Sequence, residues 1–150
     1  MSRLLLLCVV LLSAIFLIAA NMATDKAVGQ TPATRRDVER GKYLVEEVAK
    51  CPECYAPRDA QGQLKSSAWL AGATIWIQPV ARISNWADRV PPLAGLPSLT
   101  DAQMETVLEK GTGPEGETLR PPMHIYHMHP MDAKSIIAYL KSLPRGPVER

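Results

Sequence analysis

The chain has few of the residues that most active sites and metal centres use. It contains three cysteines and three histidines in 150 residues, and no set of residues resembles a catalytic triad or a paired acid and base. A net charge of +2 is too small for the basic surface that binds nucleic acid. The sequence therefore predicts neither a nucleic-acid-binding protein nor an enzyme with its own acid–base residues.

Long apolar runs are also absent, except at the N-terminus. The letters MSR are followed by an apolar run over residues 4–20 that only Ser13 interrupts. A short basic start and an apolar core of this kind are typical of an export signal. We expect residues 1–23 to be a signal peptide cleaved near Ala23, or an uncleaved membrane anchor through residues 4–20.

The rest of the chain is long enough for one domain. Residues 24–34 are polar and unpatterned, and we interpret them as a linker. The domain is expected over 35–146, with a short tail over 147–150. Its two remaining cysteines would lie in a compartment that permits disulfides.

Three segments of this domain have apolar residues at helical spacing. They cover roughly 36–50, 100–111 and 130–143. Between the first two lies a long segment, 56–99, that is rich in proline and contains all three tryptophans. No alternating pattern in it predicts a sheet, and a loop of this length usually wraps something. We predict an all-α fold of three main helices with a long wrapping loop.

Helix-start and helix-stop residues support these boundaries. Thr100 with Gln103 three residues later has the pattern of a capping box, and Gly111 is placed to end that helix. Pro130 suits the first turn of the last helix, and Pro144 would stop it.

One short motif carries most of the chemistry. In "KCPECYAPRD", Cys51 and Cys54 are separated by two residues and follow the first predicted helix. Two thiols at this spacing can add to the two vinyl groups on one edge of a haem. A disulfide is a second reading. Half of a metal site is a third, although its other ligands would have to be among His124, His127 and His129, far along the chain.

A second motif offers a ligand for iron. In "TLRPPMHIYHMHPMDA", Met123 follows two prolines, which stiffen the loop and remove backbone donors. A methionine thioether is a common axial ligand of haem in electron carriers. Met128 and Met131 are rivals. We expect Met131, in the first turn of the last helix, to be a packing residue.

From Arg40 to Leu143 the chain resembles the class I c-type cytochromes, and in particular the small exported bacterial ones. The segments "RGKYLVEEVAKCPEC", "GTGPEGETLRPPM" and "DAKSIIAYLKSLP" carry the resemblance, in this order. It implies a cytochrome c-like fold around one haem c, bound covalently by Cys51 and Cys54 with Met123 as the distal axial ligand. It also implies that Gly41 packs against Tyr139 where the first and last helices cross.

The same resemblance implies a function. The protein would be an electron carrier rather than an enzyme, in the periplasm or on the outer face of the inner membrane, with other redox proteins as its partners. Arg58 and Trp86 are candidates to bind the haem propionates by their chemistry alone.

The chain departs from the cytochrome pattern at the proximal ligand, where Tyr55 replaces the histidine that follows the second cysteine. His124 and His129 also stand where the family commonly has a proline and a serine. Tyr55 has four readings. It could ligate iron as a phenolate, or leave the proximal side open, as in a sensor or weak peroxidase. The chain could instead be haem-free with a disulfide, or Tyr55 could be a single-residue variant of a normal cytochrome. The alternative function is therefore a ligand-deficient or haem-free relative that senses or binds.

Overall fold

The structure is a computed structural model that describes residues 32–145. The predicted export segment over 1–23, the linker up to residue 31 and the tail over 147–150 lie outside the described residues. The elements below all belong to one compact unit that begins at Ala33. Over residues 32–145, no helix has the length and apolar character needed to cross a membrane.

The first predicted helix is present and begins with a capping box. Helix α2, Arg35–Tyr43, continues without a break as the π-helical segment η1, Leu44–Val48. The Thr34 side chain accepts a hydrogen bond from the Asp37 backbone N–H, while the Asp37 carboxylate accepts one from the Thr34 N–H. This reciprocal pair satisfies two of the backbone donors that a helix start leaves unpaired.

The second and third predicted helices also form, with the predicted ends. Helix α4, Asp101–Glu105, continues as η3, Thr106–Lys110, and Thr100 and Gln103 form the predicted capping box. Gly111 follows with a φ of 69°, a left-handed conformation that ends the helix at little cost for glycine. Helix α5, Pro130–Ser142, begins at the predicted proline.

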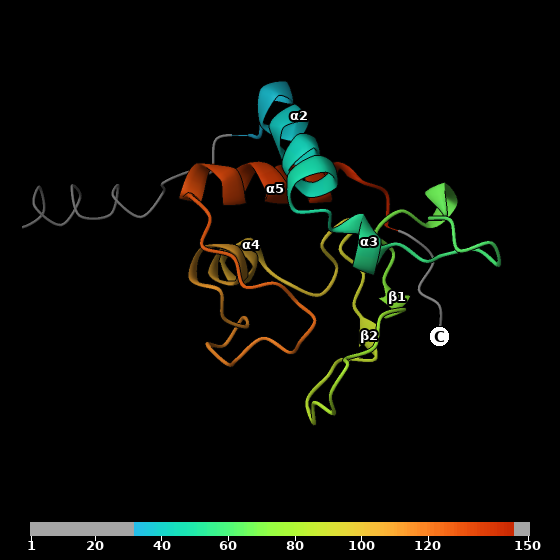
Figure 1. Ribbon diagram of the computed structural model, residues 1–150. Helices are drawn as coiled ribbons and strands as arrows, with labels where there is room; N and C mark the ends of the chain where they lie inside the picture. Colours follow the sequence, from blue (N-terminus) through green and yellow to red (C-terminus); the bar gives the residue numbers. More distant parts are fainter. Residues whose placement is uncertain (1–31, 146–150) are drawn as a thin grey trace, which may run out of the picture. The chain divides into compact units, whose positions relative to one another are not determined.

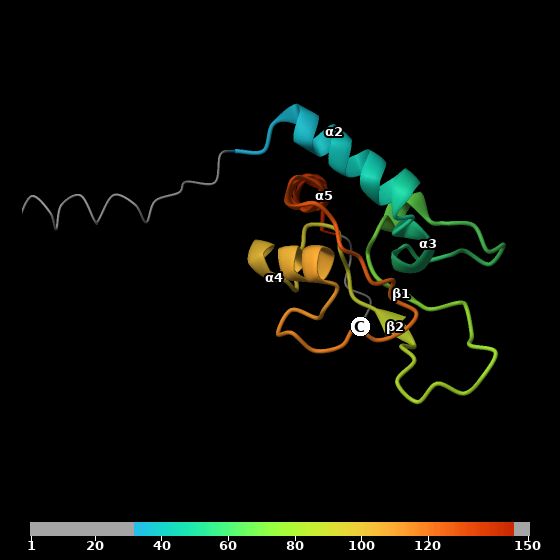
Figure 2. The same ribbon diagram turned by 60° about the vertical axis from the view of Figure 1, so that its left-hand side comes forward.

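Helices α2 and α5 cross in direct contact, which both views of the ribbon show (Figures 1 and 2). A Cβ atom on Gly41 would lie 2.8 Å from the Tyr139 Cβ and would overlap the Ser135 carbonyl. The predicted pairing of Gly41 with Tyr139 is therefore confirmed. The buried core around this crossing consists of apolar side chains from the helices and the long segment, including Val45, Leu70, Leu108, Ile136 and Leu140.

The long segment contains more regular structure than the sequence predicts. It begins after the short helix α3, Pro52–Tyr55, and includes the 3-10 turn η2, Ser66–Ala68. Strands β1, Ala73–Thr74, and β2, Arg89–Val90, pair antiparallel, with Ala73 opposite Val90. The expectation of no sheet was wrong for this pair, because strands of two residues are too short to show an alternating pattern.

Candidate functional site

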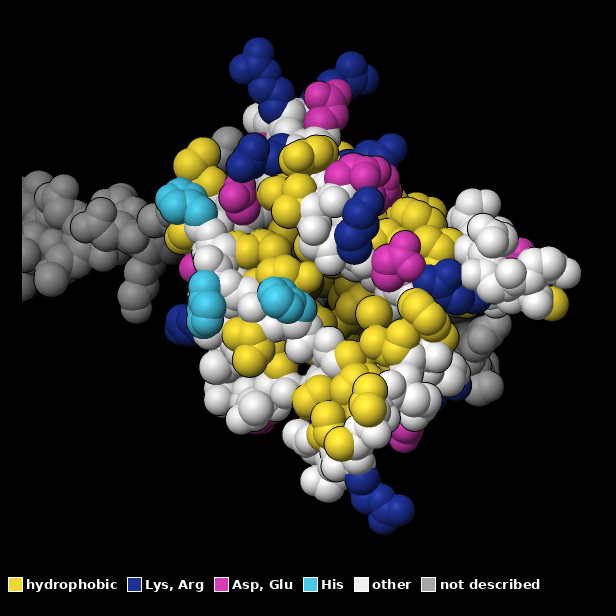
Figure 3. Space-filling view, viewed as in Figure 1, with side chains coloured by type: hydrophobic (Ala, Val, Ile, Leu, Met, Phe, Trp, Pro, Cys, Tyr) yellow, Lys and Arg dark blue, Asp and Glu magenta, His cyan; other side chains and the backbone are white. Residues whose placement is uncertain are grey.

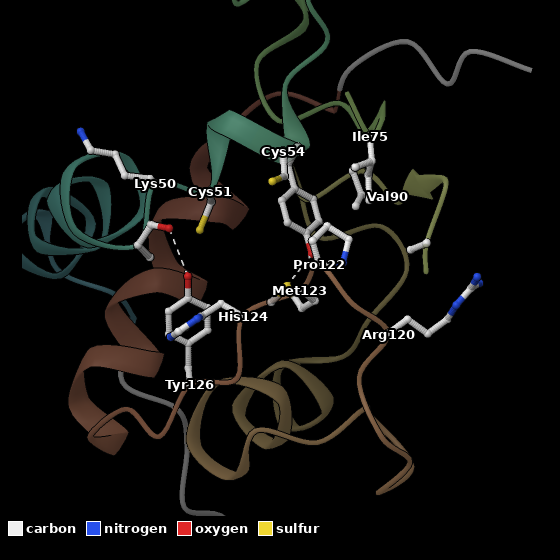
Figure 4. A pocket seen from close by; sticks show the side chains of 13 residues that line it. Lys50, Cys51, Cys54, Ile75, Val90, Arg120, Pro122, Met123, His124 and Tyr126 are labelled. Carbon is white, nitrogen blue, oxygen red and sulfur yellow. Dashed lines mark hydrogen bonds between the residues drawn. The ribbon is translucent and has the colours of Figure 1, made fainter. Parts of the chain in front are cut away.

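A pocket of about 130 Å³ opens beside helix α3. Figure 3 shows apolar side chains gathered around a hollow at the centre of one face, and Figure 4 shows the pocket itself. It is lined by residues from the end of the first helix, from α3, from the β1–β2 region and from the methionine loop: Ala49, Lys50, Cys51, Cys54, Tyr55, Ile75, Ala87, Val90, Arg120, Pro122, Met123, His124 and Tyr126.

Local backbone geometry brings the two cysteines to this pocket. Lys50 has a φ of 52°, and this left-handed residue ends the first helix. The Cys51 N–H then donates to the Val45 carbonyl at 3.0 Å, which closes the turn, and Pro52 starts α3. Because Cys54 follows Cys51 by three residues in a helical turn, both side chains reach the same pocket.

Both cysteines are half-buried free thiols, so the disulfide considered from the sequence is not formed in this structure. Burial raises the pKa of the Cys51 thiol to about 11. Burial also raises the pKa of Cys54, and the negative charge of Glu53 adds to this effect. The two thiols are therefore protonated at neutral pH.

The methionine loop is fastened to the far end of the long segment. The Ala87 N–H donates to the Pro121 carbonyl at 2.7 Å. The Arg120 guanidinium donates to the backbone carbonyls of Trp86 at 3.0 Å and Asn85 at 3.2 Å. These three bonds fix the loop so that Met123 lies across the pocket from the two cysteines (Figure 4).

Tyr55 connects the two sides of the pocket. Its hydroxyl donates a hydrogen bond to the Met123 sulfur at 3.0 Å, drawn as a dashed line at Met123 in Figure 4. Its backbone carbonyl accepts a hydrogen bond from the Gly72 N–H at 2.9 Å. Burial raises the pKa of Tyr55 well above its usual value. Tyr55 is therefore a neutral phenol that uses its proton to bind a thioether.

Cys51, Cys54 and Met123 suit a covalently bound haem in this pocket, whereas Tyr55 does not suit it as a ligand. Two thiols, one thioether and apolar walls from Ile75 and Val90 match the chemistry of such a group. The phenol does not match a ligand opposite Met123. Two metal–ligand bonds on opposite sides of a metal need about 4 Å between their donor atoms. The 3.0 Å from the Tyr55 oxygen to the Met123 sulfur is too short for this.

The rival methionines lie elsewhere. Met128 packs against the core, and its N–H donates to the Leu108 carbonyl at 2.9 Å. Met131 is 70% exposed, so the expectation that it packs was wrong. It lies about 200° around the helix from the buried Ala133, which places the two side chains on opposite faces of α5. Met123 alone of the three lines the pocket.

The histidines are exposed, and only His124 lines the pocket. Its ring meets that of Tyr126 edge to face, with 4.7 Å between centroids. His129 caps helix α5, because its ring nitrogen accepts a hydrogen bond from the Met131 N–H. In the part of the chain that the structure describes, no three His, Cys, Asp or Glu side chains are grouped closely enough to hold a metal ion.

Arg58 and Trp86, the predicted propionate donors, are not among the pocket-lining residues. The Arg58 guanidinium pairs with Glu53 at 2.5 Å and lies 4.8 Å above the Trp76 ring. Each of the two residues also has one buried nitrogen without a hydrogen-bond partner, Arg58 Nε and Trp86 Nε1. Their proposed role stays a prediction.

Two residues of the site were not identified from the sequence. Arg120 fastens the methionine loop, and its position directly before two prolines was the signal that could have found it. The Tyr126 hydroxyl donates to the Ala49 carbonyl at 3.1 Å and so ties the same loop to the end of the first helix. Nothing in the sequence spacing indicates this contact.

No protein-family model matches the chain. It is 32% identical, over 115 residues, to the fructose dehydrogenase cytochrome subunit of Gluconobacter japonicus, a match that covers 72% of the chain and 22% of that protein. It is 29% identical over 118 residues to a diheme cytochrome c-type protein of Cereibacter sphaeroides, covering 71% of the chain and 35% of the relative. The chain thus spans between about a fifth and a third of these proteins. The chain is thus similar to proteins named as cytochromes, and its helical fold brings Cys51, Cys54 and Met123 to one pocket.

Proposed function

We propose that the chain is an exported electron-transfer domain that carries one haem c. Cys51 and Cys54 are its attachment points, and Met123 is the axial ligand from the opposite wall. The observation that carries this proposal is the shared pocket, in which two free thiols and one thioether face each other across apolar walls. The similarity to proteins named as cytochromes supports it.

The attachment chemistry needs nothing beyond the thiols and the vinyl groups of the haem. Each cysteine S–H adds across one vinyl double bond. One S–C bond and one C–H bond form, while the S–H bond and the vinyl π bond break, so no electrons are gained or lost overall. Burial raises the pKa of Cys51 to about 11, so this residue is present as the thiol at neutral pH.

The other residues of the site would hold the bound group in place and limit its contact with water. When bound, the haem supplies a reversible one-electron change at iron. Ile75 and Ala87, both buried, provide apolar contacts on one side. Tyr126 and Arg120 keep the methionine loop closed through their backbone partners. A rigid apolar surrounding of this kind restricts solvent access and so helps to set the potential.

The partners would be other redox proteins in the periplasm or on the outer face of the inner membrane. One relative is named as the cytochrome subunit of a fructose dehydrogenase, so electron delivery within such a complex is the kind of role that we propose. The chain itself would be a carrier and not an enzyme.

The test is co-expression of the full chain with a haem-maturation system, followed by a haem stain of a denaturing gel. We expect a haem-positive band at the mass of the protein. Cys51→Ala and Cys54→Ala together should remove the stain, while Cys8→Ala, a change in the predicted export segment, should leave it. A properly folded chain without covalent haem would contradict the proposal.

The contact between Tyr55 and Met123 favours a second candidate function, a ligand-deficient or haem-free relative that senses or binds small ligands. In this case the haem-loaded chain would have an open coordination position and bind carbon monoxide in the ferrous state. A ferrous spectrum that carbon monoxide does not change would exclude an open haem sensor or weak peroxidase.

A further inference from the structure

The pocket contains a bridge made only of protein atoms. In the expected arrangement, residue 55 and residue 123 would stand on opposite sides of an iron. Here they bind each other directly, through the 3.0 Å hydrogen bond from the Tyr55 hydroxyl to the Met123 sulfur. The two residues are 68 positions apart in the chain, so this single bond joins the attachment helix to the methionine loop.

The length of its side chain explains why a tyrosine can reach the Met123 sulfur. The phenol oxygen extends farther from the backbone than an imidazole nitrogen. Both ends of the bridge are held in place. The Tyr55 carbonyl is bound by Gly72, and the loop that carries Met123 is bound through Arg120 and Pro121. The Tyr55 side chain also packs against the hydrophobic core. The bridge is therefore part of a fixed framework and not a chance contact between mobile side chains.

The bridge also matches the chemistry of its partners. A neutral phenol is a donor, and a thioether sulfur is a weak acceptor with no hydrogen of its own. In a half-buried site an unpaired phenol hydroxyl would be costly. Met123 supplies the partner, and Cys51 and Cys54 lie beside the bridge in the same pocket.

We propose that Tyr55 is a positioning residue that holds Met123 by this hydrogen bond and keeps the cysteine pocket closed when no haem is bound. Haem attachment to Cys51 and Cys54 then requires the bridge to open. Tyr55 does not act as an iron ligand in this proposal. The inference rests on the proposed function only for the identity of the group that enters. The bridge itself consists of protein atoms alone.

The first test measures the oxidation rate of Met123 by hydrogen peroxide in the haem-free full chain, by mass spectrometry of its peptides. Tyr55→Phe removes the hydroxyl and keeps the ring. Because a net hydrogen bond corresponds to a factor of several in a local equilibrium, we expect Met123 to oxidise about fivefold faster in this variant. The exposed Met131 is an internal reference and should not change. Tyr43→Phe is the matched control, since Tyr43 is 59% exposed and does not line the pocket.

The second test uses both partners in a double-mutant cycle. Tyr55→Phe, Met123→Leu and the double variant are compared by the alkylation rates of Cys51 and Cys54 in the folded, haem-free chain. Each single change should increase the rates by about fivefold, and the double change should add little, because either one already breaks the same bond.

Three results would overturn the proposal. One is a Met123 oxidation rate in Tyr55→Phe no higher than in Tyr43→Phe. Another is a double-mutant cycle in which the alkylation rate of the double variant equals the product of the two single effects. The third is a haem-free chain without a cooperative unfolding transition, since a closed pocket requires a folded state. None of these measurements involves haem. A negative haem stain would therefore contradict the proposed function without bearing on the hydrogen bond between Tyr55 and Met123. Equal oxidation rates would contradict the role of that bond without bearing on the proposed function.

Discussion

The α2–α5 crossing and the cysteine pocket differ in how they are built. At the crossing, backbone approaches backbone so closely that Gly41 has no room for a methyl group. In the pocket, side chains from four separate stretches meet, and most of the fastening bonds come from loops. The crossing retains the residues that its resemblance to cytochromes implies, and the pocket has Tyr55 and His124 where the family pattern has others.

This difference separates a part of the molecule that is held by close packing from a part that is held by single hydrogen bonds. The crossing is held by packing that is complete within the chain. The pocket is closed by single hydrogen bonds, one of which, from Tyr55 to Met123, joins two candidate ligand positions. Changes at the crossing should therefore alter stability, and changes in the pocket should alter ligation and access with smaller effects on stability.

The largest loss of stability is expected from Gly41→Ala. A Cβ atom at this position would overlap the Ser135 carbonyl, and neither backbone can move without separating α2 from α5. We expect the free energy of unfolding to fall by about 3 kcal/mol, measured by denaturant titration.

Gly62→Ala is the control for that change. A Cβ atom there would meet nothing within 4 Å, and only the positive φ of 79° opposes the substitution. Its cost should be about 1 kcal/mol. Equal losses for the two variants would show that the crossing is less rigid than the structure indicates.

The largest change in the pocket is expected from Tyr55→His. Histidine offers a neutral nitrogen ligand and shortens the side chain, so the contact with Met123 is removed and a position on each side of the iron becomes available. After co-expression with a haem-maturation system, we expect more covalent haem and a low-spin ferric spectrum.

Tyr55→Phe is the matched variant, because it also removes the phenol oxygen but supplies no ligand. We expect this variant to be high-spin, because residue 55 then supplies no ligand. If Tyr55→His gave the same spectrum as the unchanged chain, residue 55 would not lie under the iron.

The sequence predicted the helical parts of this molecule well, because their signals are local. Thr100 with Gln103, Gly111 and Pro130 each determine a helix end through the next few residues. The sequence also indicated which residues line the pocket, among them Cys51, Cys54, Tyr55 and Met123, but not which of them contact each other. The bond between Tyr55 and Met123 depends on how two distant loops are fastened, and no spacing in the chain encodes this distance. The roles of Cys51, Cys54, Tyr55 and Met123 toward a haem stay predictions.

An intermediate effect is expected from Glu46→Gln, which tests how the crossing is joined to the long segment. The Glu46 carboxylate accepts hydrogen bonds from the Trp69 indole N–H at 3.1 Å and from the Tyr139 hydroxyl. An amide accepts less strongly than a carboxylate, so we expect a loss of about 2 kcal/mol in the free energy of unfolding.

Glu47→Gln is the control, because its side chain is 62% exposed and pairs only with Lys50. That surface pair should contribute less than about 0.5 kcal/mol. A loss of the same size in both variants would mean that the Glu46 network does not join the two regions.

The last effect is a loss of stability that appears only at alkaline pH, and it originates in the pocket. Burial raises the pKa of Cys51 from 9.0 to about 11, so between these values the unfolded chain releases a proton that the folded chain retains. Stability is therefore complete below pH 9 and falls as the pH rises towards 11. Cys51→Ala should flatten this part of the pH dependence in denaturant titrations, whereas Gly41→Ala should lower the whole curve without changing its slope. Identical slopes in the Cys51→Ala variant and the unchanged chain would show that Cys51 is not sheltered in the closed pocket.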